Sequence, residues 1–243
     1  TDWLWIDVLQ NANLEKVLPG VRAKVYWNLM LISELDPLFH EAYYAGANLM
    51  TVINDDHLGA LTLLAKGKDF LESWGPKKYP RAVIDRYWAQ AWRLPMIAGY
   101  IRLFELGDMN SAAAEFVHAA AMPNAPVFLQ LLSKRFAQPG GEYEVGMRLI
   151  NFMLLDHRDG VARAKLEKKR RDLYLAQYLD SLSREFMNFS RGHATMPKLE
   201  QRFAKFLKEF KIAPKDPWGG KLFLDASGRV MSTTKRERVF GLE

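Results

Sequence analysis

The sequence predicts an all-α fold in which pairs of antiparallel helices stack into a solenoid. The first observation is a recurring pattern in which small or apolar residues lie four and then three positions apart, as on one face of a helix. The second is its period: the pattern starts at residues 25, 60, 112 and 146, at intervals of 35, 52 and 34 residues. The third is a turn-forming residue five positions before each start, namely Gly20, Asp55, Gly107 and Gly141.

The clearest unit is the segment GDMNSAAAEFVHAAAMPNAP at residues 107–126. Ala112, Phe116 and Ala119 share one helical face, and Pro123 ends the helix. A small side chain at Ala112 lets a neighbouring helix approach, and Phe116 fills the adjacent space. The same frame is found at Val25, Leu29 and Ile32; at Ala60, Leu64 and Gly67; and at Gly146, Ile150 and Met153.

A further helix is expected before three of these units, at residues 39–53, 92–106 and 126–137. The long interval contains an insertion at residues 68–91. Trp74-Gly75-Pro76 and Tyr79-Pro80 are expected to break the helix there, before a short helix over residues 81–90. We interpret the insertion as a segment that lengthens the preceding helix or caps the groove. Residues 1–156 thus form the predicted repeat domain.

Two further regions follow the repeats. Residues 157–211 are expected to form a long helix, from about residue 159 to 190, and then an amphipathic helix over residues 197–211. The amphipathic helix carries Phe203, Phe206 and Phe210, and we expect it to cap the last repeat. The alternatives are a helix that fills the groove itself and a helix that binds a membrane surface or a partner. In the tail, residues 212–243, two apolar runs flank Asp225-Ala226-Ser227-Gly228 and predict a short β-hairpin.

The order of the segments WLWIDVLQ, LDPLFHEAYYAGANLM, GDMNSAAAEFVHAAAMPNAP and DPWGGKLFLDASG resembles that of bacterial tetratricopeptide-repeat (TPR) proteins. The resemblance implies a TPR-like α-α superhelix and a non-enzymatic scaffold or adaptor that binds other proteins in a multi-protein complex. It also implies a hydrophobic membrane anchor before the tryptophan-rich opening. The expected location is therefore the cell envelope, on the periplasmic side of the inner membrane, with the cytoplasm as the alternative.

The residue types needed for several kinds of chemistry are missing or wrongly spaced. The chain has no cysteine, which excludes disulfides, thiolate metal sites and cysteine nucleophiles. Its five histidines include no H-E-x-x-H pair, and neither a phosphate-binding loop nor a G-x-S-x-G motif occurs. Asp55-Asp56-His57 is expected to cap a helix rather than bind a metal. We therefore expect no catalytic residues, no metal and no cofactor.

The concave groove of the predicted superhelix is the first candidate binding site. Its expected lining is mostly apolar, so it should bind an apolar or helical protein segment, with Arg135 orienting an acidic residue of the partner. The predicted groove residues are Leu94, Ile97, Ile101, Phe128, Leu131 and Arg135.

A basic patch on the long helix is the second candidate site. The chain has a formal net charge of +6, and a cluster of cations can bind nucleic acid or an anionic surface. Nucleic-acid binding is the less favoured alternative, and it should be weak because no aromatic stacking residues lie close by. The patch consists of Arg163, Lys165, Lys168, Lys169, Arg170 and Arg171.

Overall fold

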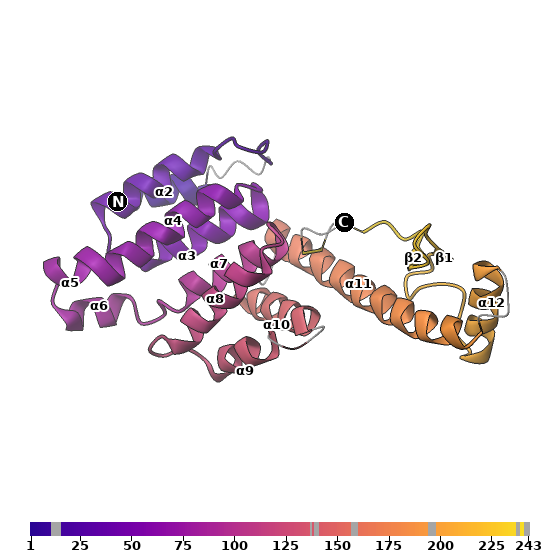
Figure 1. The fold of residues 1–243 in the computed structure, drawn as a ribbon. Helices are drawn as coiled ribbons and strands as arrows, with labels where there is room; N and C mark the ends of the chain where they lie inside the picture. Colours follow the sequence, from indigo (N-terminus) through magenta and orange to yellow (C-terminus); the bar gives the residue numbers. More distant parts are fainter. Residues whose placement is uncertain are drawn as a thin grey trace. The chain divides into compact units, whose positions relative to one another are not determined.

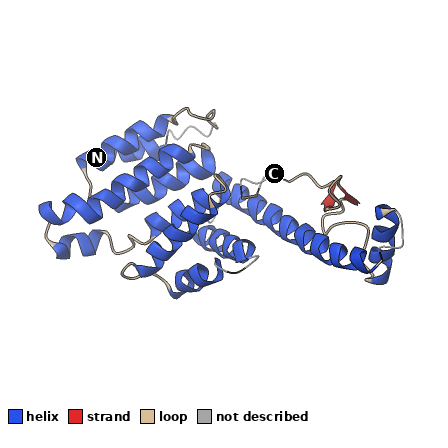
Figure 2. Cartoon of the chain, in the orientation of Figure 1, coloured by secondary structure: helices blue, strands red, loops and turns tan. Residues whose placement is uncertain are grey.

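The computed structural model describes residues 1–10, 16–136, 138, 141–156, 160–193, 198–236 and 239–240. This part of the chain is mostly helical, with one short two-stranded antiparallel sheet near its C-terminus (Figures 1 and 2). The chain divides into two compact units. Unit 1 contains residues 1–167 and 240–243, and unit 2 contains residues 168–239.

The helices of unit 1 follow the predicted pattern. The four repeat frames fall on α2, α4, α8 and α10, and the expected preceding helices are α3 with η1, α7 and α9. Consecutive helices contact each other as hairpins, in the pairs α1–α2, α3–α4, α7–α8 and α9–α10. The helical prediction is confirmed, whereas membership of the tetratricopeptide family stays a prediction. The elements are α1 (Asp2–Gln10), α2 (Lys24–Leu35), α3 (His40–Asn48), the π-helical turn η1 (Leu49–Ile53), α4 (His57–Asp69), the π-helical turn η2 (Phe70–Trp74), α5 (Gly75–Lys78), α6 (Arg81–Tyr87), α7 (Arg93–Phe104), α8 (Met109–Ala121), α9 (Val127–Phe136), α10 (Gly141–Asp156) and the start of α11 (Gly160–Gly192).

Three of the four predicted turn residues have the left-handed backbone conformation of a turn, whereas Gly141 is the first residue of α10. Gly20, Asp55 and Gly107 have positive φ angles of 85°, 59° and 66°, a conformation common in turns. Asp56 caps α4 by accepting the backbone N–H of Gly59 at 2.9 Å, as expected. Its other carboxylate oxygen accepts the backbone N–H of Ala23 at 2.8 Å. One buried carboxylate therefore joins the start of α4 to the residue before α2.

The insertion departs from the prediction at Gly75-Pro76. The chain stays helical there, since α4 is followed directly by η2 and then α5. Pro76 lies in the first turn of α5, where a missing backbone N–H costs little. The break comes at Tyr79, which is extended as expected for a residue before proline. The following helix, α6, ends at Tyr87 rather than at residue 90.

Helix α7 lies at the centre of unit 1. Ten of its twelve residues are buried, and it contacts α3, α4, α8 and α10. Small residues permit this close packing. An ideal Cβ on Gly67 of α4 would lie 2.6 Å from Cδ2 of Leu94, and one on Gly99 would lie 2.5 Å from Cε1 of Phe116. The small-residue pattern of the sequence thus marks places where helices meet α7.

Unit 2 contains the rest of α11, helix α12 (Leu199–Glu209) and the hairpin of β1 (Leu222–Leu224) and β2 (Val230–Ser232). The two strands are antiparallel, with Leu222 opposite Ser232, and they coincide with the predicted hairpin. Phe203 and Phe206 pack against Phe186 of α11, with ring centroids 5.2 and 5.7 Å apart.

The amphipathic helix had been assigned to the last repeat or to the groove. Instead, the structure buries Phe203 and Phe206 in unit 2's own core, whereas Phe210 is 57% exposed. This core consists of Leu175, Leu179, Leu182, Phe186, Phe203, Phe206, Leu222 and Val230.

Ala112 tests the packing of α8, because its side chain is fully buried. We expect Ala112→Trp to lower the free energy of unfolding by on the order of 1–3 kcal/mol through overpacking. Ala114→Trp is the matched control, since Ala114 is exposed on the same helix. Urea denaturation measures both variants. Equal stability of the two would contradict the assigned helix frame.

His40 is a buried histidine at the start of α3. It lies between the rings of Trp88 and Tyr44, at centroid distances of 5.3 and 6.3 Å. Burial and the positive charge of Arg93 lower the pKa of His40 and a hydrogen bond with the backbone of Gln90 raises it, so that the pKa is about 4. His40 is therefore neutral in the folded protein at neutral pH.

This pKa shift predicts a pH dependence of stability. The unfolded chain binds a proton at His40 below about pH 6.5, whereas the folded chain does so only near pH 4. The free energy of unfolding should therefore fall as the pH drops from 6.5 to 4, by on the order of 3 kcal/mol from this residue. His40→Gln should flatten this part of the curve. A parallel curve for the variant, measured by urea denaturation at each pH, would contradict the assignment.

Candidate protein-binding cleft

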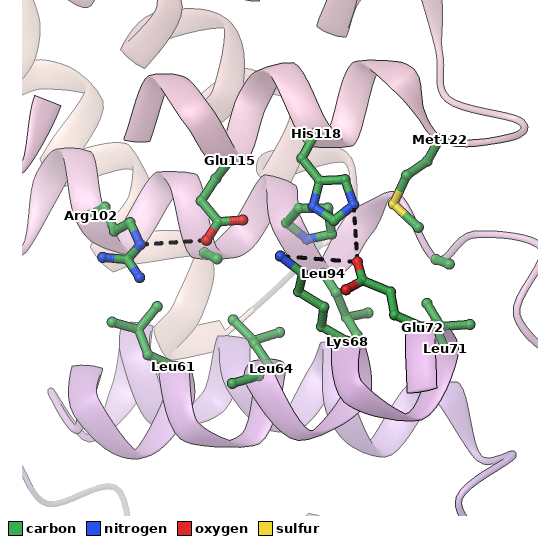
Figure 3. Close-up of a pocket in the computed structure, with 14 residues that line it drawn as sticks. Leu61, Leu64, Lys68, Leu71, Glu72, Leu94, Arg102, Glu115, His118 and Met122 are labelled. Carbon is green, nitrogen blue, oxygen red and sulfur yellow. Dashed lines mark ion pairs between the residues drawn. The ribbon is translucent and has the colours of Figure 1, made fainter. Parts of the chain in front are cut away.

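A cleft in unit 1 lies between α4 with η2 on one side and α7 with α8 on the other (Figure 3). Its cavity volume is about 260 Å³. The lining residues are Leu61, Leu64, Ala65, Lys68, Leu71, Glu72, Ala91, Leu94, Pro95, Ala98, Arg102, Glu115, His118 and Met122.

The first wall is one continuous helical face. Leu61, Leu64, Ala65, Lys68 and Leu71 follow each other at steps of three, one, three and three residues, which keeps them on one side of α4 and η2. The distance along the helix axis from residue 61 to residue 71 is about 15 Å. The cleft is therefore elongated and follows three turns of helix.

The second wall comes from α7 and α8. Leu94, Pro95 and Ala98 lie on the first turns of α7, and they are buried. The small side chain of Ala98 leaves room opposite α4, and Pro95 is tolerated because it lies in the first turn of the helix. Met122, just after α8, lies at the end of the cleft nearest Leu71 (Figure 3). Its flexible thioether can adapt to different apolar shapes.

Ion pairs lie at two places along the apolar floor. Arg102 pairs with Glu115 at 3.5 Å, and Glu72 pairs with both Lys68 and His118, at 4.0 and 3.6 Å (Figure 3). Every ionisable side chain that lines the cleft therefore has a partner of opposite sign within the cleft, counting His118 when it is protonated. Such partly exposed pairs add little stability. Their effect on binding is that a partner needs no charge to match this surface.

The structure places the three predicted groove residues of α7 differently from the prediction. Leu94 lines the cleft, whereas Ile97 and Ile101 have no exposed surface. The reason is that α7 is covered on several sides by α3, α4, α8 and α10. Ile97 and Ile101 therefore form core contacts and offer no surface to a partner in this structure.

The three predicted groove residues of α9 do not line the cleft. Phe128 is half-buried against Phe152, with ring centroids 5.0 Å apart, and Leu131 is 52% exposed. Arg135 pairs with Glu144 at 2.6 Å and also hydrogen-bonds to Gln138. Arg135 is predicted to orient an acidic residue of a partner, but its guanidinium is already paired with Glu144 of the same chain.

The predicted basic residues all lie on α11, and several are engaged within the chain. Arg163 pairs with Glu167 at 2.9 Å, and Lys165 donates to the backbone oxygen of Ile53 at 2.8 Å. Arg171 pairs with buried Asp172 at 3.2 Å. Arg163 and Lys165 belong to unit 1, and Lys168, Lys169, Arg170 and Arg171 belong to unit 2. The two ion pairs reduce the positive charge available to a polyanion.

The α4 wall of the cleft was not predicted as a binding surface. Its signal was present in the sequence, since Leu61, Leu64, Ala65 and Leu71 form an apolar stripe at helical spacing. That stripe also fits a helix face buried in a core. Whether the stripe is a binding surface or a buried core face depends on the distance between α4 and α8. The periodicity of the sequence does not predict that distance.

Comparisons of the chain with known protein families, with curated proteins and with solved structures found no match. Within the described residues, no helix is both long enough and apolar enough to cross a membrane. In the same part of the chain, no three histidine or acidic side chains are grouped as metal ligands would be.

A substitution at Ile101 tests whether this residue lies in the core or faces an open groove. We expect Ile101→Glu to lower the free energy of unfolding by about 4 kcal/mol or more, because it places a carboxyl group in a fully buried apolar site. Leu131→Glu, at an exposed position, should leave stability nearly unchanged. Thermal unfolding followed by circular dichroism measures both. An unchanged transition for Ile101→Glu would mean that this residue faces an open groove after all.

Proposed function

We propose that this chain is a non-enzymatic protein-binding scaffold or adaptor that holds an apolar segment of a partner protein in the cleft between α4 and α7–α8. The observation that carries the proposal is the form of the cleft. It combines an apolar floor about three helical turns long with ionisable groups that pair with one another.

The size of the cleft favours a protein segment over a small-molecule cofactor. Its volume of about 260 Å³ lies below the roughly 300–1,000 Å³ of typical small-molecule pockets. A few apolar side chains would fill it, as when a helix places residues spaced by three and four positions into a groove. The half-buried Leu61 and Leu71, with Met122, offer the apolar surface that such anchors need.

The proposed assembly and cellular location of the scaffold rest on the sequence resemblance. The likeness to bacterial tetratricopeptide-repeat proteins supports a multi-protein assembly of the cell envelope, and the chain of helical hairpins is compatible with an α-solenoid. Repeats of this kind bind partners on surfaces formed by neighbouring helices. The cleft is such a surface, since it is formed by helices of two successive hairpins, α3–α4 and α7–α8.

A charge placed in the cleft tests the proposal. Ala65 lines the cleft but is exposed, so Ala65→Glu should fold normally and weaken partner capture by about tenfold or more. Thr62→Glu is the matched control, because Thr62 is exposed on the same helix and does not line the cleft. A photo-reactive residue at position 65 or 62 first identifies the partner in bacterial membrane extracts. Binding of the purified partner is then measured by calorimetry.

Two results would contradict the proposal. One is equal crosslinking from positions 65 and 62. The other is an unchanged affinity of the Ala65→Glu variant for the purified partner.

A further inference from the structure

A second pocket in unit 1 contains a group of polar side chains that the proposed function does not use. It has a cavity volume of about 580 Å³, within the range of small-ligand sites. We call it the α3 pocket, because Glu41, Tyr44, Ala45 and Asn48 of α3 all line it. Their spacing of three, one and three residues places them on one face of that helix.

The α3 pocket also has apolar lining residues from other helices. Trp5 and Leu9 of α1 line it, and so does Val161 at the start of α11. Leu9 is 62% exposed and Val161 is 45% exposed. The pocket therefore offers apolar surface to a ligand that enters from solvent.

Arg93, the cation of this pocket, is paired through its Nη1 atom, whereas its Nε atom has no hydrogen-bond partner in the described chain. Arg93 donates to Oδ2 of Asp156 at 2.9 Å, and its guanidinium lies 4.6 Å from the ring centroid of Tyr44. The hydroxyl of Tyr44 donates to the same oxygen of Asp156 at 2.5 Å. The guanidinium and the phenol are thus directed at Asp156, and they hold its carboxylate in a fixed position.

Glu41 adds a second carboxyl group to the pocket. Burial raises the pKa of Glu41, the positive charge of Arg93 lowers it, and the negative charge of Asp156 raises it. The lining therefore contains two carboxyl groups and one guanidinium. Lys165 of α11 donates to the carbonyl of Ile53, another lining residue, at 2.8 Å.

Asn48 gives an independent indication of a missing donor. Its side chain is 4% exposed, and its amide nitrogen donates to the backbone oxygen of Tyr44 at 3.1 Å. Its Oδ1 atom has no hydrogen-bond partner in the described chain. A buried polar atom without a partner costs free energy, so it marks a place where a donor would bind favourably. A ligand here would meet the acceptors of Glu41, Asp156 and Asn48, together with one donor, Nε of Arg93, which also lacks a hydrogen-bond partner.

We propose that the α3 pocket binds the primary ammonium group of an organic ligand with an apolar arm. The ammonium would donate to Glu41, Asp156 and Asn48, and the arm would lie against Trp5, Leu9 and Val161. An ammonium carries three donors and no acceptor, which fits a lining of two carboxyl groups and an amide oxygen. The aromatic face of Trp5 adds favourable cation–π attraction. This site is separate from the cleft and does not rest on the proposed protein-binding function.

The first test compares n-hexylammonium with 1-hexanol by isothermal titration calorimetry on the full chain. The two probes share an apolar arm and differ in charge. Hexylammonium should bind at least tenfold more tightly than hexanol. Glu41→Gln should remove about tenfold of its affinity, because the amide keeps the shape of the side chain but removes one of the two carboxyl groups that would accept from the ammonium. Glu72→Gln, which neutralises a carboxylate in the cleft instead, should leave the affinity unchanged.

A second variant tests the location. Ala45 is half-buried in the pocket wall, so Ala45→Trp should fill the pocket and abolish binding of hexylammonium. The peptide-like probe Nα-acetyl-lysine methylamide identifies the source of the ammonium. Binding of this probe with the same Glu41 dependence points to a protein lysine, and binding of hexylammonium alone points to a free amine. Equal affinity for hexylammonium and hexanol, no binding at millimolar concentration, or no effect of Glu41→Gln would overturn the proposal.

Discussion

The packing around α7 is the constraint on which the rest of unit 1 depends. This helix is buried on most of its surface, and α4 and α8 approach it closely because glycines occupy the contact points at Gly67 and Gly99. Neither contact has space for an additional methyl group. Small residues next to these contacts, Ala65 on α4 and Ala98 on α7, line the cleft. The contacts that hold the hairpins together therefore also determine where a binding surface can form.

Helical periodicity predicted the positions of the helices in the sequence more accurately than it predicted which helices pack against one another. The spacing of Ala112, Phe116 and Ala119 was sufficient to place α8, because a helix that buries one face must carry this pattern. The same pattern does not state how many neighbours a helix has, so Ile97 and Ile101 were assigned to an open groove although α7 is covered on several sides. The short hairpin was predictable because Asp225 to Gly228 is a strong turn signal between two apolar runs.

Contacts between side chains that lie far apart in the sequence could not be predicted from the sequence. Arg135 was assigned to a partner protein, yet its charge is matched by Glu144 on the next helix of the same chain. In the same way, Asp156, Arg93 and Tyr44 come from three helices and meet only in the folded chain. The apolar face of α12 was recognised correctly as a surface that must be buried, but α11 and the hairpin, which bury it, are partners of unit 2 itself. Residue type and spacing specify what a side chain needs, whereas the tertiary fold decides what it meets.

The two sites of unit 1 differ in chemistry in a way that suits different ligands. The cleft is apolar and its charges are internally paired, whereas the α3 pocket combines two carboxyl groups with a buried amide oxygen that lacks a donor. The central claim is that a partner protein occupies the cleft. Methyl nuclear magnetic resonance of leucine- and methionine-labelled protein, titrated with the crosslinked partner segment, tests it most directly. The account predicts that the methyl signals of Leu61, Leu71 and Met122 shift on binding. Shifts confined to exposed leucines outside the cleft, such as Leu131 and Leu155, would contradict it.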